Sequence, residues 1–377
     1  MSSHKLRIGV DASMLSEQRT GIGNYVFHLL QQLQEGPDGG GFSFHLYSHR
    51  AIAPDCRFLG ACTEQVGAWL RKGPLWLSTA LPPLLARDRI DVFWGANGYL
   101  PLYAGRSCQT VVTIYDLVYR HAGHTMPWHS YWARRLLQPL AARKANAIMA
   151  ISRATAAEIK QHYGREANAV ITPGMDPVFR VVSAEAKAEV AHKYQLPPKF
   201  WFTLGTLEPR KNLLTLLQAY AQVQKMHPDT CPPLVLAGAR GWLDRALQAR
   251  LQHMTAEGHV RWLGFVPQKD MPALYGACAS FLFFPLYEGY GMPVREALLC
   301  GAPVLCSDLA ALREAGEGHA RYAGTGVDDI RRTLLEHMTQ THAPIRIDRQ
   351  SLRGDESDQA ARFAQVLRLA CAGKVGR

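Results

Sequence analysis

A chain of 377 residues is long enough to fold into two domains, each with a hydrophobic core of its own. Its composition, with 47% hydrophobic and 19% charged residues, excludes a disordered chain, and no apolar run is long enough to span a membrane. The formal net charge of +11 favours an anionic partner, which could be a nucleic acid, an anionic lipid surface or a diphosphate ligand.

Further global features narrow the class of protein. The sequence has no zinc-binding spacing, no aromatic RNA-binding signature and no helix-turn-helix pattern, so no nucleic-acid partner is expected. Its eight cysteines are scattered without a C-x-x-C pair, which is typical of reduced core thiols rather than disulfides or metal ligands. The N-terminus leads straight into a strand pattern, Leu6 to Val10, instead of a signal-peptide apolar region. We therefore expect a cytoplasmic protein.

The first half of the chain alternates short apolar strands with helical patterns. The predicted strands are Leu6 to Val10, Phe42 to Tyr47, Val92 to Trp94, Thr110 to Tyr115, Ala147 to Ile151 and Ala169 to Thr172. Such alternation indicates an α/β fold with a parallel sheet that is covered by helices on both faces. Proline- and glycine-rich residues 173–177, a polar helical piece and Pro197-Pro198 then indicate a hinge.

The second half repeats the same alternation. Its predicted strands are Trp201 to Thr206, Leu234 to Ala237, Val260 to Gly264, Phe281 to Phe284 and Val304 to Cys306, and a last helical pattern covers Asp358 to Cys371. The predicted division is a first Rossmann-like domain over 1–175, a linker over 176–198, a second Rossmann-like domain over 199–355 and a C-terminal helix over 356–377. Doubly wound domains bind ligands at the carboxyl ends of their strands, so the sites are expected in those loops.

Two such loops lie in the first half. Gly21 and Gly23 follow the first strand and precede a helical pattern that reaches Leu33; paired glycines let a backbone approach a ligand closely, although an ordinary tight turn would use them too. Tyr115 and Asp116 end another strand. A tyrosine can hydrogen-bond a sugar, but its ordinary pKa of about 10 makes it a poor general base at neutral pH. Asp116 could instead cap the following segment.

Arg210 and Lys211 precede the helical pattern from Leu213 to Lys225, in a loop that starts with Gly205 and Thr206. Cations are electrostatically unfavourable at a helix start, and a bound anion such as a diphosphate would remove the conflict. The alternative is a solvated basic turn.

The stretch from Phe283 to Ala297 reads as the end of a strand, a glycine-rich loop and a helix whose first residue is Pro293. Backbone N–H groups at the helix start, in the loop Gly289, Tyr290, Gly291 and Met292, could bind an anion. Glu288 before the loop and Glu296 in the first helical turn could accept hydrogen bonds from sugar hydroxyls, although Glu296 could also simply complement the helix dipole. Ser307-Asp308 is expected to cap a short helix that reaches Glu314.

These motifs, in this order, resemble those of the retaining glycosyltransferases of family 4, which have the GT-B fold. The resemblance implies that Glu296 binds the ribose of a nucleotide, and that Glu288 and residues 289–292 bind the transferred sugar. It also implies that Arg210 and Lys211, followed by Asn212, neutralise the departing diphosphate, and that the Gly21/Gly23 loop lies beside the donor phosphates or the acceptor.

One motif departs from the family. Relatives usually carry His-Asp where this chain has Tyr115-Asp116, and that histidine contacts the transferred sugar. His121 or His124 could compensate for its absence. The resemblance also implies that the C-terminal helix crosses back to pack on the first domain.

The reaction that the resemblance implies is transfer of a hexose with retention at the anomeric carbon, with mannose from GDP-mannose as the first choice. The implied acceptor is a lipid-diphosphate-linked glycan of bacterial lipopolysaccharide or O-antigen biosynthesis, at the inner face of the cytoplasmic membrane. No Asp-x-Asp motif is present, so no metal ion or other cofactor is expected. The alternatives are transfer of rhamnose, another deoxyhexose or glucose from a dTDP-, GDP- or UDP-sugar, a nucleotide-sugar epimerase, and a non-catalytic nucleotide-sugar or polyanion binding protein.

Two stretches combine aromatic, basic and leucine residues in a way that suits a membrane interface. They are residues 69–85, with Trp69, Arg71, Lys72 and Trp76, and residues 127–144, with Trp128, Trp132, Arg134, Arg135, Arg143 and Lys144. A helix packed on a parallel sheet would use the same leucines. Packing in the core is favoured for the first stretch, and both interpretations remain open for the second.

Overall fold

The computed structural model describes residues 5–16, 19, 21–65, 73–105, 108–241, 245–339 and 356–372. These residues form two compact units. The first unit takes the described residues of 1–117, 128–174 and 355–377, and the second takes those of 118–127 and 175–354. Trp69, Arg71 and Lys72 lie outside the described residues.

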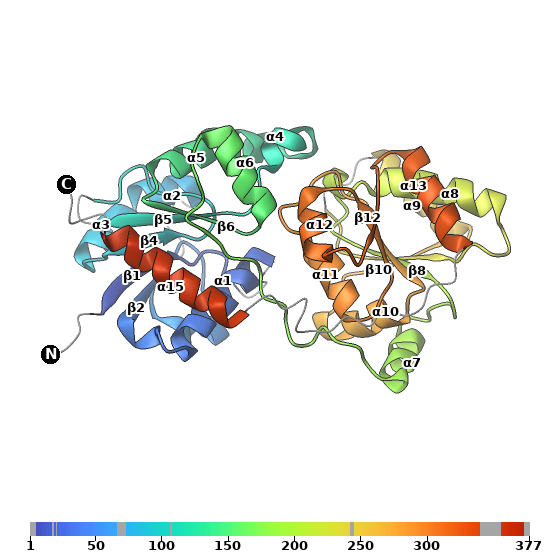
Figure 1. Ribbon diagram of the computed structural model, residues 1–377, viewed down its shortest axis with the longest axis horizontal. Helices are drawn as coiled ribbons and strands as arrows, with labels where there is room; N and C mark the ends of the chain where they lie inside the picture. Colours follow the sequence, from blue (N-terminus) through green and yellow to red (C-terminus); the bar gives the residue numbers. More distant parts are fainter. Residues whose placement is uncertain are drawn as a thin grey trace. The chain divides into compact units, whose positions relative to one another are not determined.

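The first unit is built on a seven-stranded sheet in the order β3-β2-β1-β4-β5-β6-β7, in which every neighbouring pair is parallel (Figure 1). Its strands are β1 (Leu6–Asp11), β2 (Phe42–Ser48), β3 (Ala61–Glu64), β4 (Val92–Gly95), β5 (Gln109–Ile114), β6 (Ala147–Ala150) and β7 (Ala169–Val170). Its helices are α1 (Gly21–Glu35), α2 (Gly73–Thr79), α3 (Leu81–Arg87), α5 (Trp128–Lys144), α6 (Arg153–Tyr163) and α15 (Glu356–Ala372). The central strand β4 is buried throughout, as expected for a strand covered on both faces.

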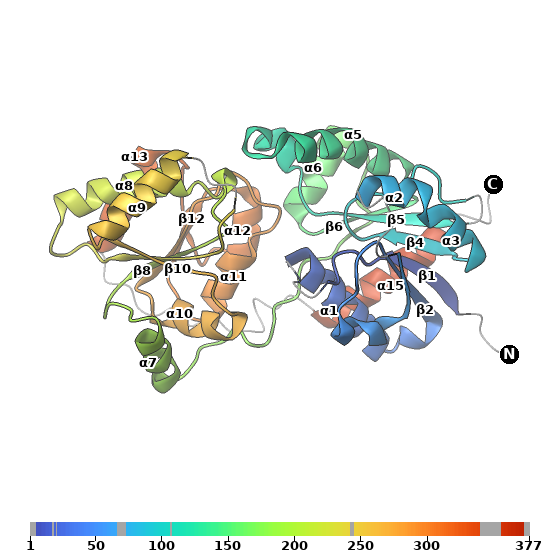
Figure 2. The same cartoon turned by 180° about the vertical axis from the view of Figure 1, so that it is seen from behind.

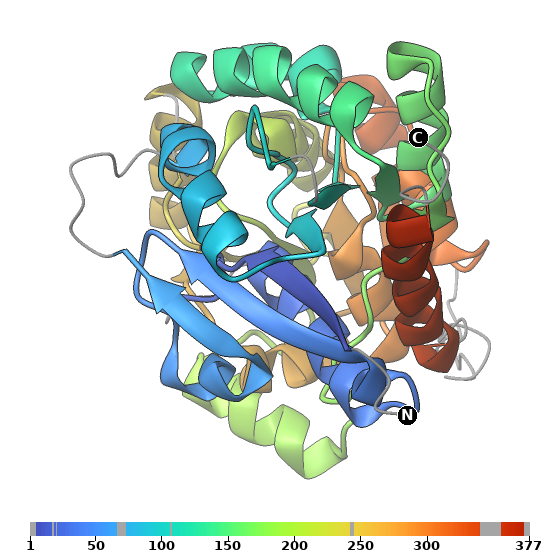
Figure 3. The same cartoon turned by 90° about the vertical axis from the view of Figure 1, so that its left-hand side faces the viewer.

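Adjacent residues of β4 face opposite sides of this sheet. Phe93 packs in a cluster with Trp76 of α2 and Leu85 of α3, whereas the ring of Trp94 lies 4.6 Å from that of Phe363 on α15. The C-terminal helix also bonds to this unit through Gln359, whose side-chain amide donates to the Thr172 hydroxyl at 2.7 Å. The prediction that this helix returns to the first domain is confirmed, and Figures 1 and 3 show α15 along this unit.

The second unit has a six-stranded parallel sheet in the order β10-β9-β8-β11-β12-β13 (Figure 2). The strands are β8 (Trp201–Leu204), β9 (Leu234–Ala237), β10 (Val260–Gly264), β11 (Ser280–Phe283), β12 (Val304–Ser307) and β13 (Arg321–Ala323). Its helices are α4 (Val118–His121), α7 (Ala184–Lys193), α8 (Leu213–Met226), α9 (Arg245–Ala256), α10 (Met271–Ala277), α11 (Met292–Leu299), α12 (Ala310–Gly316) and α13 (Val327–Met338). The predicted α/β class with two Rossmann-like domains is therefore confirmed.

The largest differences from the predicted strands are at the sheet edges. β3 and β13 were not predicted, because the sequences Ala-Cys-Thr-Glu and Arg-Tyr-Ala carry no apolar run. The predicted strand from Trp201 to Thr206 ends at Leu204, and the one from Ala169 to Thr172 ends at Val170. Within the described residues, no helix combines the length and the apolar character that crossing a membrane requires.

Candidate active site

The loop between β11 and α11 holds the predicted glycine-rich motif. Helix α11 begins at Met292, so Pro293 is its second residue rather than its first, and Glu296 lies in the second turn rather than the first. The helix therefore begins one residue earlier than predicted. It does so because Gly291, which has a left-handed φ of 107°, is the N-cap residue.

Gly291 is required for steric reasons as well. A Cβ atom there would lie 2.4 Å from Leu312 Cδ2, which is too close for any other residue. Ser307, at the end of β12, donates its hydroxyl hydrogen bond to the Pro285 carbonyl at 2.7 Å and so supports the start of the same loop. The predicted capping role of Ser307-Asp308 is wrong: Leu309 is the N-cap of α12 without a side-chain bond, and Asp308 forms an ion pair with Arg313.

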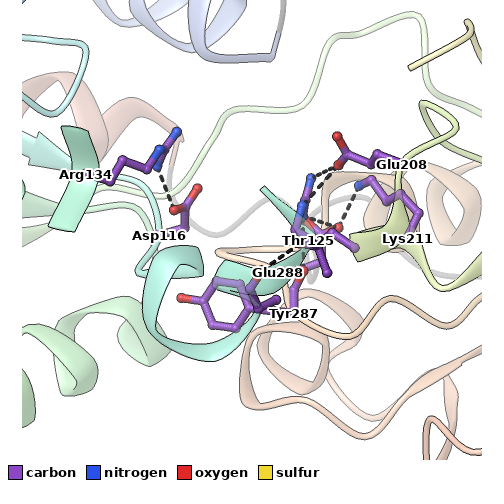
Figure 4. Close-up of polar contacts among 9 residues, drawn as sticks. Asp116, Thr125, Arg134, Glu208, Lys211, Tyr287 and Glu288 are labelled. Carbon is purple, nitrogen blue, oxygen red and sulfur yellow. Dashed lines mark hydrogen bonds and ion pairs between the residues drawn. The ribbon is translucent and has the colours of Figure 1, made fainter. Parts of the chain in front are cut away.

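Glu288, in the loop after β11, forms ion pairs with Arg210 and Lys211 in the loop after β8. Its Oε1 atom lies 2.6 Å from Lys211 Nζ and 2.9 Å from Arg210 Nη1, although the loops are separated by more than seventy residues in sequence. Figure 4 shows Lys211 and Glu288 directed toward each other, with Glu208 beside them. The Glu288 and Lys211 side chains are only 12% and 13% exposed, so this charge cluster is largely shielded from water.

Hydrogen bonds to Glu208, Tyr287 and Leu286 fix the position of Arg210. Its Nε and Nη2 donate to Glu208 Oε1 at 3.1 and 2.7 Å, and its Nη1 donates to the Tyr287 carbonyl at 3.0 Å. Its own carbonyl accepts from the Leu286 amide at 2.9 Å. These bonds fix the guanidinium relative to the loop that carries Glu288.

The environment of Glu288 keeps it ionised. Burial opposes the charged form, but the positive charges of Lys211 and Arg210 outweigh it, and the pKa of Glu288 lies below its ordinary value of 4.5. An anion already sits between the two cations, and in this structure that anion is the Glu288 carboxylate.

The loop after β8 is shaped to place Lys211. A Cβ atom on Gly205 would lie 3.2 Å from Lys211 Cγ, so the glycine leaves room for the lysine stem. Thr206 is exposed beside it. Asn212 adopts the left-handed conformation, with a φ of 57°, directly before α8, and its side-chain amide donates to the Thr325 carbonyl at 2.9 Å. This bond fixes the residue that precedes α8, next to Arg210 and Lys211.

Glu296 lies in a different environment from Glu288. Its Oε2 accepts from the Tyr275 hydroxyl at 3.1 Å. Burial raises the pKa of Glu296 to about 7; the hydrogen bond from Tyr275 acts in the opposite direction, and the nearby negative charge of Asp176 adds to the rise. The two predicted acidic residues therefore differ, with Glu288 ionised and Glu296 close to half-protonated at neutral pH.

This raised pKa predicts a pH-dependent stability. Between the ordinary value of 4.5 and about 7, the folded protein holds a proton on Glu296 that the unfolded chain has released, so stability falls as the pH rises through this interval. Glu296→Gln removes the effect. Relative to wild type, the variant should gain roughly 1–3 kcal/mol in free energy of unfolding between about pH 5 and about pH 8. Urea unfolding at both pH values measures it, and an equal difference at both would contradict the assignment. Glu189→Gln, at an exposed position of α7, is the control.

In the first unit, Tyr115 is turned into the core. Its hydroxyl donates to the Ala96 carbonyl at 2.7 Å, and its ring meets Tyr25 edge-on at 5.6 Å. Burial raises its pKa well above the ordinary value. The prediction that Tyr115 could contact the transferred sugar is therefore corrected, since its hydroxyl is buried and bonded to the Ala96 carbonyl.

Asp116 accepts from Arg134 Nη1 at 2.8 Å, as drawn in Figure 4, and its carbonyl accepts from the Gln138 side-chain amide at 2.8 Å.

The two glycines of the first unit differ from each other. A Cβ atom on Gly23 would lie 2.5 Å from the Met14 carbonyl oxygen, so Gly23 permits close packing of α1 against the segment that follows β1. Gly21 opens α1 and has open space around its Cα. Packing explains Gly23, and nothing in the fold requires a glycine at position 21.

Residues 118–127 provide a contact that the sequence patterns did not indicate. They belong to the second unit, where Val118, Ala122 and Met126 cluster with Tyr287. The ring of His121 stacks on that of Tyr287 at a centroid distance of 4.9 Å and an interplanar angle of 8°. His121 thus lies beside the residue that precedes Glu288, and both His121 and His124 are exposed.

The structure therefore brings together Glu288, Arg210, Lys211 and the 289–292 loop in the second unit. Glu208 and Tyr275 complete the polar contacts of this region and were absent from the predicted site. The E-x-R spacing could have pointed to Glu208, since it places a carboxylate two residues before the arginine. No sequence signal pointed to Tyr275.

Comparison with known proteins gives the family context of this geometry. Residues 19–179 match the model of the family described as Glycosyltransferase Family 4, and residues 185–323 match that of Glycosyl transferases group 1. The chain is 34% identical over 286 residues to the O-antigen chain mannosyltransferase B of Escherichia coli, covering 72% of this chain and 73% of that protein.

More distant similarities extend the comparison. The chain is 33% identical over 205 residues to the serotype-specific mannosyltransferase WbdA of Escherichia coli, which covers 52% of this chain but only 25% of WbdA. Among solved structures, it is similar to WaaG, a glycosyltransferase involved in lipopolysaccharide biosynthesis, with a TM-score of 0.66, 12% identity, and coverage of 99% of this chain and 100% of WaaG. It is also similar to Anabaena Alr3699/HepE in complex with UDP and glucose, with a TM-score of 0.64, 17% identity and 99% coverage of both chains. At these identities the two structural matches show the fold.

Proposed function

The chain belongs to the glycosyltransferases of family 4, and from this premise we propose that it transfers a mannosyl residue from GDP-mannose to a lipid-diphosphate-linked glycan in bacterial lipopolysaccharide or O-antigen biosynthesis. The observation that carries the proposal is the cluster of Arg210, Lys211 and Glu288 where the loops after β8 and β11 meet. Two of the relatives are named as mannosyltransferases of Escherichia coli, which favours mannose as the transferred sugar.

In this proposal, the donor diphosphate takes the place that the Glu288 carboxylate now occupies between the two cations. Backbone N–H groups at the start of α11, opened by Gly291, add further donors for its oxygens. Glu288 is then released to face the transferred sugar, and Glu296, with its pKa of about 7, accepts hydrogen bonds from the ribose hydroxyls.

The transfer step breaks the bond between the anomeric carbon and the phosphate oxygen and forms a bond from that carbon to an acceptor oxygen. The acceptor proton passes to the departing phosphate on the same face, which retains the anomeric configuration. Arg210 and Lys211 stabilise the negative charge that develops on the phosphate, a contribution on the order of 10²–10³ in rate per preorganised group. No metal ion is assigned to this step in the proposal. A cytoplasmic protein in peripheral contact with the inner membrane face would have access to both substrates.

A transfer assay tests the proposal. The protein is incubated with lipid-linked glycans that end in mannose and with labelled GDP-mannose, UDP-glucose or dTDP-rhamnose, and the product linkage is determined by NMR. We expect transfer from GDP-mannose with an α-linked product, the configuration of the donor. A β-linked product, or transfer from only one of the other donors, would contradict the proposal.

A further inference from the structure

Helix α5 carries its large apolar side chains on its outer surface. Trp128, Trp132, Leu136 and Leu140 are 77%, 48%, 58% and 41% exposed. The buried residues of this helix are Gln138, Ala141 and Ala142, which are small or polar. A surface helix normally buries its large apolar residues against the core, and α5 does the reverse. Packing on the sheet therefore does not account for these tryptophans and leucines.

The apolar surface continues beyond α5. Lys144 Nζ donates to the Leu102 carbonyl at 3.2 Å, and the Leu102 amide donates at 3.4 Å to the hydroxyl of Ser78 on α2. Figures 2 and 3 show α2 and α5 on the same side of the first sheet. We define the α5 surface as the exposed residues Leu75, Leu102, Tyr103, Trp128, Trp132, Leu136 and Leu140.

This surface holds seven of the twelve large apolar side chains that are exposed in the described part of the chain. Single exposed apolar residues are ordinary, whereas a concentration in one region marks an interaction site. By contrast, Trp76, in the first predicted membrane-friendly stretch, is fully buried in the core, so the core interpretation is confirmed for that residue.

The charge around the α5 surface is strongly positive. From residue 92 to residue 157 the only acidic residue is Asp116, which is paired with Arg134. Among the described residues of the first unit, the same stretch contains five basic residues, Arg134, Arg135, Arg143, Lys144 and Arg153. The Arg135 guanidinium lies over the rings of Tyr131 and Trp132, 5.9 Å from each centroid, so cation and aromatic residues share one side of the helix.

This combination selects among the partners that could cover an apolar surface. A second copy of the chain would bring the same positive charges face to face, which is unfavourable. A nucleic acid would match the charge but leave the leucines and tryptophans in water. A bilayer with anionic headgroups satisfies both, because the aromatic and aliphatic side chains enter the interface while the basic residues meet lipid phosphates.

We propose that the α5 surface docks this protein on an anionic lipid bilayer. The inference rests on the proposed function only in that a lipid-linked acceptor explains why such docking would be useful; the exposure and charge of the surface stand without it. Docking in this way holds the first unit, to which α5 belongs, at the leaflet that carries the acceptor.

Vesicle co-sedimentation of the full chain, without donor or acceptor, tests the inference. Wild type is compared with Leu136→Glu on phosphatidylethanolamine vesicles that contain phosphatidylglycerol, and on neutral phosphatidylcholine vesicles. Leu369→Glu is the matched control, because Leu369 is 52% exposed, lies on α15 of the same unit, and the substitution changes the net charge equally. Each variant's thermal unfolding is recorded to confirm that it folds.

We expect wild type to bind the anionic vesicles more strongly than the neutral ones. Leu136→Glu should bind them at least about tenfold more weakly, and Leu369→Glu should bind as wild type does. Binding of Leu136→Glu at the wild-type level, or absence of wild-type binding, would overturn the inference. So would sedimentation velocity showing a wild-type dimer that Leu136→Glu dissociates, since the surface would then belong to a second copy. Transfer to a water-soluble acceptor should be unchanged in Leu136→Glu. If neither wild type nor Leu136→Glu transfers a sugar to this acceptor while vesicle binding gives the expected result, the proposed function fails and the docking inference stands.

Discussion

Glu288→Gln is expected to lower turnover by at least about 10³-fold and, at the same time, to tighten binding of GDP by about tenfold. The loss follows from removing the carboxylate proposed to face the transferred sugar. The gain follows because Glu288 now occupies the space between Lys211 and Arg210, at 2.6 and 2.9 Å, where it competes with an incoming diphosphate. A neutral amide competes far less.

Opposite changes in turnover and nucleotide affinity distinguish this role from a structural one. A variant that merely distorted the loop would lose both. Leaving two shielded cations without their carboxylate should also lower the stability of the unliganded variant by roughly 1–3 kcal/mol, and GDP should restore it. Turnover is measured by product formation and affinity by calorimetry, with Glu189→Gln as the control. Turnover within about threefold of wild type would reject the catalytic assignment.

Lys211→Ala is expected to lower turnover by about 10²–10³-fold. The Lys211 side chain is only 13% exposed, so water screens its charge little. In the proposal its ammonium lies where negative charge develops on the departing diphosphate, and alanine leaves that charge unopposed. Because Glu288 also loses its nearest cation, the pKa of that carboxylate should rise from its depressed value.

A matched variant separates this effect from a change in net charge. Lys225→Ala removes the same charge from an exposed position of α8, the helix that follows the Lys211 loop, and should leave turnover unchanged. Equal losses in both variants would indicate that overall charge, not the placement of Lys211, supports the reaction.

The sequence predicted the strands correctly where they are buried on both faces of the sheet. β4, β6 and β9 are continuous apolar runs, because helices cover both sides of the sheet. The edge strands β3 and β13 were missed, since an edge strand has one neighbouring strand and is held by backbone pairing more than by apolar side chains.

Fewer features of the candidate site could be predicted from the sequence. The rule that ligands bind at the carboxyl ends of parallel strands led to the loops of Arg210, Lys211 and Glu288, and the structure joins these residues. The direction in which a side chain points is decided by packing, so the inward turn of Tyr115 could not be read from residue type. The same limit applies to the bond from Asn212 to the Thr325 carbonyl.

Contacts that link distant segments were beyond sequence reasoning altogether. The stack of His121 on Tyr287 joins two segments with no shared motif. The pKa of about 7 at Glu296 arises from burial, with further influence from Tyr275 and Asp176, neither of which lies near it in sequence. On α5, only the observed exposure decided between packing in the core and an outer apolar surface.

Thermal unfolding with a panel of nucleotide sugars tests the central claim most directly. At about 100 times its dissociation constant, a bound donor should add about 2.7 kcal/mol of stability. We expect GDP-mannose to stabilise the wild type to this extent, UDP- and dTDP-sugars to do so much less, and Glu296→Ala to lose the response to GDP-mannose relative to its own unliganded state. Absence of stabilisation by every nucleotide sugar, or an equal response in Glu296→Ala, would contradict the assignment of the donor site to the loop and helix that carry Glu288 and Glu296.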